Sequence, residues 1–192
     1  MTNPTLDWIH SLFPPRAKQY FFVEAGAHDG VGDSQTKALE DEGWTGICVE
    51  PSSAFAGLQA SRKCRVDNRC LWKVDGVQVP FRQVAGNSIE LSGIEECFRD
   101  GHDRTDSRTF LKDAVSLPTL LAEHQAPDII EFLGLDTEGS EYDILLGHNF
   151  DRYLFLAITV EHNGVSEQRG LIRKLLTSKG YVLSRDNEIE DS

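Results

Sequence analysis

The first limits on this protein come from features that its sequence lacks. No run of about 18 uncharged apolar residues occurs, so we expect no membrane span. Residues 1–22 lack a basic segment followed by an apolar one, so we expect no signal peptide. The four cysteines show no CxxC spacing, which argues against a zinc site and favours buried thiols in a reducing, cytoplasmic environment.

Positive charge is also scarce. The sequence has 19 Lys and Arg residues against 31 Asp and Glu residues, and its formal net charge is −12. A surface of this sign repels phosphates, so we expect no nucleic-acid partner. Because the chain has 192 residues, no internal repeat and no Gly/Ser-rich linker, we expect residues 1–192 to form one domain.

Apolar runs predict a buried sheet. A weaker run covers 64–68, and the continuous ones cover 20–25, 46–50, 129–136 and 154–161. Continuous runs are typical of parallel strands that helices cover on both faces. Helix signals between them mark 34–42, 53–62, 115–124 and 169–180. The expected fold class is therefore α/β, with a doubly wound, mostly parallel sheet whose ligands bind at the carboxyl ends of the strands.

One segment interrupts the alternation of strands and helices. Residues 72–92 alternate around Gly76 and Gly86, which predicts antiparallel β structure, and the charged stretch 93–114 is expected to be a loop over one face. We therefore expect 72–114 to form a small β insertion with a substrate-side loop. Arginines in this loop would meet solvent or, alternatively, an anionic substrate; they are Arg99, Arg104 and Arg108.

A glycine turn after the first strand suggests a cofactor site. The stretch "EAGAHDG" places Glu24, Gly26, His28 and Gly30 where a strand passes into a helix, without the GxGxxG pattern of a pyrophosphate cradle. Glu50 ends the next strand, where a carboxylate can accept both hydroxyls of a ribose. Acids at this place favour the cationic S-adenosylmethionine over NAD. The alternative is a tight turn and a solvated glutamate.

The third strand end offers a weaker signal. Asp67 or Asn68 could bind an adenine amino group, although such residues more often form turns.

Polar side chains also follow the last two strands. Asp136 and Glu138 come directly after one strand, and Glu161, His162 and Asn163 end the next. These ends converge in a doubly wound sheet, so Asp136 or His162 could take a proton from an acceptor hydroxyl. Alternatively, Asp136 with Glu161 or Asn163 could hold a divalent ion such as Mg or Mn. The structural alternatives are a helix cap for Asp136 and Glu138 and a core-edge position for His162.

These motifs resemble the FkbM family of S-adenosylmethionine-dependent methyltransferases. The resemblance rests on "FFVEAGAHDGVGDSQT" at 21–36, "GWTGICVEPS" at 43–52, "VSLPTLL" at 115–121, "LGLDTEGSEYDIL" at 133–145, "ITVEHNG" at 158–164 and "KGYVL" at 179–183. It implies a Rossmann-like class I methyltransferase sheet and O-methylation of a sugar, glycan or natural-product hydroxyl.

The resemblance also implies roles for individual residues. The first cofactor loop would contain Glu24, Gly26, Ala27, His28, Asp29 and Gly30, followed by Ser34 and Thr36. Glu50 would bind the ribose. Asp136, bordering the cofactor as well, and Glu138 would stand at the methyl-transfer centre beside Glu161, His162 and Asn163.

The sequence departs from the family pattern at both ends. It stops at "RDNEIEDS", where such domains continue into a final antiparallel strand, and its N-terminal helix is brief. We therefore expect an incomplete sheet edge and a more open site, or one that a second subunit completes in a homo-oligomer. Two rival functions are a catalytically silent cofactor-binding module and, disfavoured by the missing GxGxxG, a nicotinamide-dependent oxidoreductase.

Overall fold

The computed structural model describes residues 4–14, 19–32 and 34–192. The helices are α1 (Pro4–Leu12), α2 (Lys37–Asp41), α3 (Phe55–Ser61), α4 (Leu117–Glu123), α5 (Glu141–Leu146) and α6 (Ser166–Ser178), with 3-10 turns η1 (Gly86–Leu91) and η2 (Glu95–Cys97). The strands of the main sheet are β1 (Phe21–Ala25), β2 (Thr45–Val49), β3 (Arg65–Asp67), β8 (Ile129–Leu135), β9 (Leu154–Glu161) and β10 (Glu190–Asp191). All five strands expected from the apolar runs are present, and the α/β class is confirmed.

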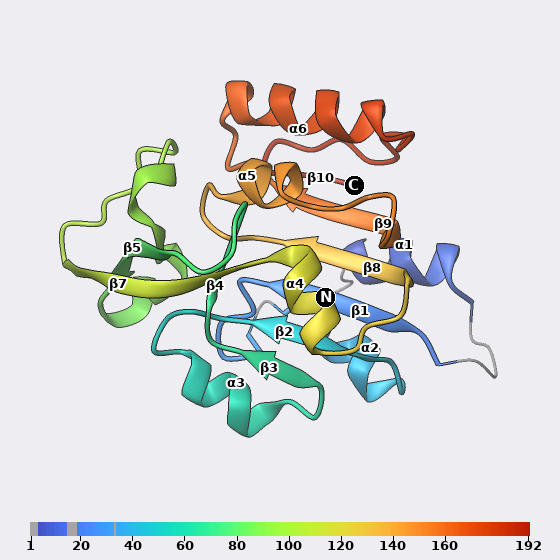
Figure 1. The fold of residues 1–192 in the computed structure, drawn as a ribbon, viewed down its shortest axis with the longest axis horizontal. Coiled ribbons are helices and arrows are strands. Elements are labelled where there is room, and N and C mark those ends of the chain that lie inside the picture. Colours follow the sequence, from blue (N-terminus) through green and yellow to red (C-terminus); the bar gives the residue numbers. More distant parts are fainter. Residues whose placement is uncertain (1–3, 15–18, 33) are drawn as a thin grey trace.

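The main sheet has the order β10-β9-β8-β1-β2-β3 (Figure 1). Pairing is parallel from β9 through β3, and β10 runs antiparallel to β9. The edge that we expected to be incomplete therefore carries a short antiparallel strand. Because the order reverses between β1 and β8, the carboxyl ends of these two strands open a crevice.

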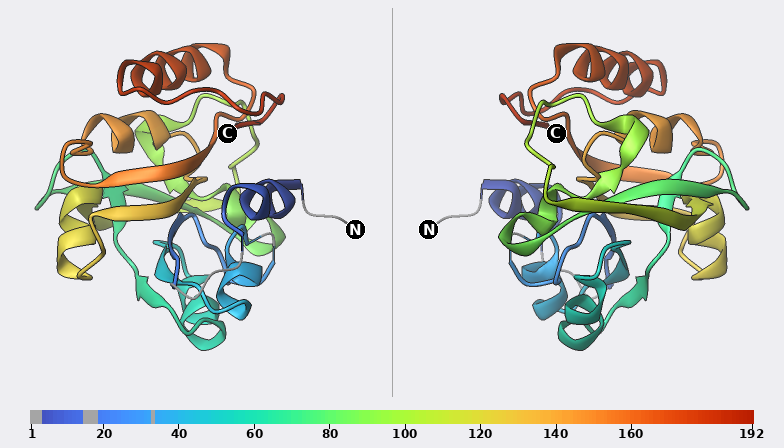
Figure 2. Two further views of the ribbon diagram at one scale, coloured as in Figure 1. Left: turned by 90° about the vertical axis from the view of Figure 1, so that its right-hand side faces the viewer. Right: turned by 90° about the vertical axis from the view of Figure 1, so that its left-hand side faces the viewer.

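Two helical layers cover the sheet, and strand alternation decides which side chains meet which layer (Figure 2). Val23 of β1 packs in the core that includes side chains of α4, α5 and α6. Its neighbour Phe22 points to the opposite core, which includes side chains of α1, α2 and α3. Both faces of the strands are thus buried, which explains the continuous apolar runs.

The insertion forms a second sheet at one end of the first (Figure 1). It contains β4 (Cys70–Trp72), β5 (Gln78–Val84), β6 (Gly93–Ile94) and β7 (Ser107–Ser116), in the order β4-β7-β5-β6. β5 pairs antiparallel with β6 and β7, whereas β4 pairs parallel with β7. A small core of its own includes Trp72, Phe81 and Ile94.

The prediction of a loop over 93–114 was wrong in its second half. β7 is the longest strand of the described chain, with 10 residues. Its partner β5 lies earlier in the same insertion and pairs with it from Gln78↔Asp113 to Val84↔Ser107. Most of the β7 side chains before Ala114 are exposed or partly exposed, so the strand lacks the apolar run that marks a buried strand.

Within the described part of the chain, no helix combines the length and the apolar character needed to cross a membrane.

Candidate active site

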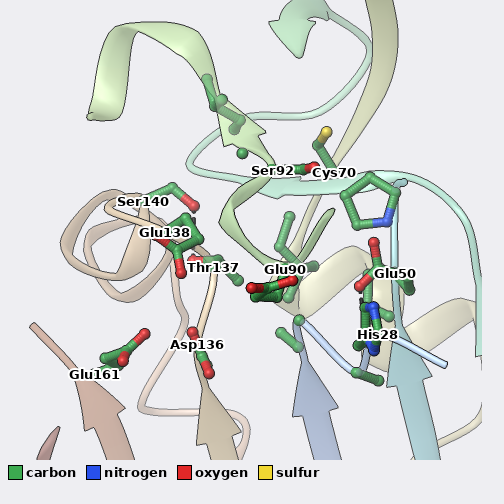
Figure 3. Close-up of a pocket in the computed structure, with 18 of the residues that line it drawn as sticks. His28, Glu50, Cys70, Glu90, Ser92, Asp136, Thr137, Glu138, Ser140 and Glu161 are labelled. Atoms are coloured by element: carbon green, nitrogen blue, oxygen red, sulfur yellow. Dashed lines mark hydrogen bonds between the residues drawn. The ribbon is translucent and has the colours of Figure 1, made fainter. Parts of the chain in front are cut away.

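A cavity of about 470 Å³ lies at the carboxyl ends of β1, β2, β8 and β9. The insertion closes its other side, where η1 and the residues around β6 reach over the sheet (Figure 3). Of the predicted site residues, eight line this cavity: Gly26, Ala27, His28, Ser34, Glu50, Asp136, Glu138 and Glu161. The structure thus brings together the turn after β1, the acid after β2 and the acids after β8 and β9.

Gly26 is the first residue of the turn after β1, at the point where β1 and β8 separate. Its φ is +82°, in the left-handed region that side chains other than glycine rarely adopt. A Cβ there would lie 1.6 Å from the carbonyl oxygen of Asp136. Glycine is therefore required by the close approach of the two strand ends, independently of any ligand.

Glu50 is fixed by the backbone of two loops. One carboxylate oxygen accepts a hydrogen bond from the amide of His28 at 2.9 Å, and the other accepts one from the amide of Ser52 at 2.7 Å. Each carboxylate oxygen can accept a further hydrogen bond. The Glu50 carboxylate therefore faces the cavity in a fixed orientation with acceptor capacity to spare.

Glu24 lies beneath the cavity instead of lining it. As the neighbour of Val23 on β1, it points to the α2–α3 side of the sheet, where its carboxylate accepts hydrogen bonds from Ser34, Thr36 and the amide of Gln35. The buried guanidinium of Arg62 contacts the same carboxylate at 3.3 Å. This network anchors the segment after the glycine turn, and Thr36 belongs to it without reaching the cavity.

The other two residues of the predicted loop also have structural positions. Asp29 accepts hydrogen bonds from the amides of Val31 and Gly32, both at 2.9 Å, which lower the pKa of its carboxyl group. Gly30 has a φ of +78°, and a Cβ there would lie 2.7 Å from side-chain atoms of Leu58. Both residues shape the turn from outside the cavity lining.

Asp136 and Glu161 form a carboxyl pair across the ends of β8 and β9. Burial raises the pKa of both groups, and the hydrogen bond and charge that Glu161 presents raise the pKa of Asp136 well above its usual range. Of two adjacent carboxyl groups in such surroundings, one keeps its proton to a higher pH than an isolated carboxyl group does. The pair can therefore accept or release a proton at the edge of the cavity.

Glu138 completes an acidic triad with Asp136 and Glu161. One oxygen from each carboxyl group lies within 4.8 Å of the others. Burial, reinforced by the charge of Asp136, raises the pKa of Glu138 to about 8, and the charge of Arg104 opposes this shift. Arg104 donates to Glu138 at 2.7 Å and also holds Asp100 through two hydrogen bonds.

The sequence favoured a solvated side chain for Arg104, but the structure buries it. It is 6% exposed, its Nε donates to the carbonyl of Leu91 at 2.8 Å, and its guanidinium lies 3.9 Å from the ring centre of Phe98. These contacts tie the insertion to the loop after β8. Nothing in the local sequence of Arg104 indicates them, because its partners come from three separate segments.

The predicted adenine contacts, Asp67 and Asn68, lie outside the cavity lining. Burial disfavours the charge of Asp67, but hydrogen bonds from Arg69 and His124 lower the pKa of its carboxyl group to about 2. Asn68 donates to the carbonyl of Glu50 at 2.8 Å and accepts from Lys112 at 2.6 Å. Both side chains stabilise the junction of β3 with the insertion.

His162 and Asn163 also lie outside the cavity lining. The His162 ring is buried, its Nδ1 accepts a hydrogen bond from the amide of Gly164 at 3.2 Å, and its Nε2 lies 3.6 Å from Asp191. Burial lowers its pKa. Because side chains alternate along an extended strand, His162 turns away from the side that Glu161 faces. The structure therefore does not bring these two residues to the acidic triad.

Sequence reasoning missed the residues that the insertion contributes. Glu90, Ser92 and Cys70 line the cavity opposite the sheet. No residue pattern marks them, because they reach the cavity only through the pairing of β5 with β6 and β7.

A cavity at the reversal point of an α/β sheet, lined by fixed acids, is the architecture of a ligand-binding enzyme domain. Residues 24–183 match the methyltransferase FkbM domain. Because the match covers most of the chain, the protein belongs to the FkbM methyltransferase family, and the resemblance found in the sequence is confirmed. No curated protein matches the chain.

Proposed function

We propose that this protein transfers a methyl group from S-adenosylmethionine to a hydroxyl oxygen of a sugar, glycan or natural product. The observation that carries the proposal is the placement of Glu50 and the Asp136–Glu161 pair in the same cavity. One end of the cavity has a rigid acceptor for a ribose, and the other has a group that can receive a proton. Membership of the FkbM methyltransferase family supports this assignment.

The strand order supports a Rossmann-like class I fold. Counted along the main sheet alone, the strands follow the order 3-2-1-4-5-6, which is the order of dinucleotide-binding folds, with the last strand antiparallel. In such folds an acid at the end of the second strand binds the ribose hydroxyls.

The residues at the turn suit this cofactor. Glu50 is pinned by two amides and keeps free acceptor positions, which a ribose diol can occupy. Beside it, the Nε2 atom of His28 is buried without a hydrogen-bond partner among the described residues. A buried nitrogen of this kind gains from a polar ligand.

Bound S-adenosylmethionine supplies the methyl group as a reactive sulfonium. The protein's own residues would orient the acceptor hydroxyl and remove its proton. The pKa values of Asp136 and Glu161 are raised by burial, so an ionised carboxylate of this pair is a stronger base than an ordinary one, and we assign the pair as the general base. His162, our other candidate base, does not line the cavity, so the proposal assigns it no proton transfer.

A divalent cation is a second way to activate the hydroxyl. The triad offers oxygen ligands that suit Mg²⁺ or Mn²⁺, but one oxygen of Glu138 is already in contact with Arg104. Asn163, which the sequence suggested as a ligand, is outside the cavity lining. Methyl transfer that is unchanged in excess chelator would remove the cation from the proposal.

Isothermal titration with S-adenosylhomocysteine tests the cofactor assignment directly. The parent protein should bind, and Glu50→Gln should bind about 10-fold or more weakly, because a hydrogen bond to a charged group contributes about 1.5–3 kcal/mol. Gln keeps an oxygen for only one of the two backbone amides that Glu50 accepts from, so circular dichroism and urea unfolding of the variant check that the loops stay folded. The exposed Glu96 lies outside the cavity lining, and Glu96→Gln is the matched control.

Failure of the folded parent to bind would end the proposal. Tight binding without transfer of labelled methyl groups to any hydroxylated acceptor would instead favour the silent cofactor-binding module.

A further inference from the structure

The charges around the cavity determine which acceptors it can admit. We propose, resting on the methyltransferase function above, that the acceptor is an alcohol that also carries an ammonium group, as amino sugars do, and that phosphorylated or carboxylated acceptors are excluded.

The first observation is the absence of positive side chains. Among the described residues that line the cavity, there is no lysine or arginine, whereas five residues carry carboxyl groups: Glu50, Glu90, Asp136, Glu138 and Glu161. Of these, Glu50 and Glu90 have no ion pair with a lysine or arginine among the described residues, and low-dielectric walls strengthen the field that unpaired charges produce in a cleft. An anionic acceptor would therefore enter against repulsion.

The second observation concerns three basic residues of the adjoining insertion, whose charged groups are engaged elsewhere. Arg104 pairs with Asp100 and Glu138, and Arg82 pairs with Glu95. Lys112 donates to Asn68. A phosphate or carboxylate in the cavity would have to compete with these contacts to use Arg82, Arg104 or Lys112, and the exposed Arg108 is outside the cavity lining.

The third observation separates Glu90 from the other acids. Glu50 is held by backbone amides, Asp136 lies beside Glu161 as a carboxyl pair, and Glu138 is paired with Arg104. For the Glu90 carboxylate, no hydrogen bond or ion pair is found with the residues that the structure describes. Glu90 is thus the acid whose charge is left for a ligand.

The position of Glu90 assigns this charge to the acceptor side. Glu90 lies on η1 of the insertion, and Figure 3 shows its side chain between the acidic triad and the two residues His28 and Glu50. In the proposed function, Glu50 and His28 bind the cofactor, and the acidic triad contains the pair that takes the proton. A cation bound at Glu90 would therefore bring a neighbouring hydroxyl toward Asp136 and Glu161.

Binding of matched sugars to the protein saturated with S-adenosylhomocysteine tests the inference. The probes are glucosamine, glucose and glucose 6-phosphate, which differ in a single substituent, and amide chemical shifts at low ionic strength report weak binding. We expect glucosamine to bind more tightly than glucose, and glucose 6-phosphate to bind least.

Glu90→Gln should reduce the advantage of glucosamine by up to about fivefold, the effect of removing an exposed ion pair. Glu96→Gln makes the same change of charge outside the cavity lining and should leave the advantage intact. Since Glu90 is exposed, its substitution should not disturb folding, and circular dichroism checks this.

Three results would overturn the inference: equal binding of glucosamine and glucose, binding of glucose 6-phosphate as tight as that of glucosamine, or an advantage that Glu90→Gln leaves unchanged. If Glu90→Gln weakened S-adenosylmethionine and left the sugars alone, the carboxylate would serve the donor, and the inference would also fail. If the parent did not bind S-adenosylhomocysteine, the proposed function would fail, while the same sugars on the free protein would still measure the selectivity of the cavity.

Discussion

The carbonyl oxygen of Asp136 lies 1.6 Å from the place where a side chain at Gly26 would begin. The glycine turn after β1 and the end of β8 are therefore in direct backbone contact, and the width of the crevice between these strands depends on the absence of a side chain at Gly26.

Substitution of Gly26 by alanine should be strongly destabilising. The left-handed φ costs about 1–2 kcal/mol, and forcing apart two packed strand ends adds about 1–3 kcal/mol. Gly76→Ala is the control, because Gly76 has a φ of +70° and no atom within 4 Å of its ideal Cβ. Urea unfolding should show only the cost of the left-handed φ for Gly76→Ala. Equal losses of unfolding free energy in the two variants would mean that the contact with Asp136 is unimportant.

The Arg62–Glu24 contact should support the stability of the fold. Arg62→Met leaves the buried Glu24 carboxylate without its cation and should lower the free energy of unfolding by about 3–5 kcal/mol. Arg65 is exposed, and Arg65→Met should cost less than about 1 kcal/mol in the same denaturant titration. A loss at Arg62 no greater than that at Arg65 would contradict the role of the network.

The raised pKa of Glu138 predicts a pH dependence of stability. In the folded protein this carboxyl group has a pKa of about 8, against an ordinary value of 4.5, so the native state binds more protons between these values. Its stabilising contribution is complete below pH 4.5 and is lost as the pH rises through about 8.

The variant Glu138→Gln isolates this effect. Relative to the parent, its free energy of unfolding should rise by up to about 1.4 kcal/mol per pH unit between pH 4.5 and about 8. The contributions of the histidines are the same in both proteins and cancel in the difference. The comparison is made by urea unfolding in a buffer with chelator. A difference that is independent of pH would show that Glu138 titrates near its ordinary value.

The two histidines of the predicted site should separate in their effects on S-adenosylhomocysteine binding. His28 lines the cavity at a φ of +49°, which asparagine tolerates, so His28→Asn should weaken binding about 2- to 10-fold through one lost hydrogen bond. His162→Asn should leave the dissociation constant unchanged and lower only thermal stability. A reversal of these two results in calorimetry would place His162 at the ligand.

Several elements of the site could be predicted because they depend on local patterns. Glu50, Asp136 and Glu161 each stand where a buried apolar strand ends, and the end of a strand can be found from the run of residues before it. In a parallel sheet these ends meet at one edge. The predictions for Glu24 and His162 placed them at the same edge, but alternation turned one beneath the sheet and the other toward β10.

The amino-acid sequence by itself determined the strands, the glycine turn and the acids at the strand ends, because period, backbone freedom and the burial of apolar runs are local properties. Only the tertiary structure decided which charges are free. Arg104, Glu138 and Glu90 come from separate segments; Glu138 and Glu90 line one cavity, and Arg104 pairs with Glu138 from outside its lining. A glutamate that has a partner and one that is free for a ligand look alike in the sequence, because they differ only in a contact between distant segments of the fold.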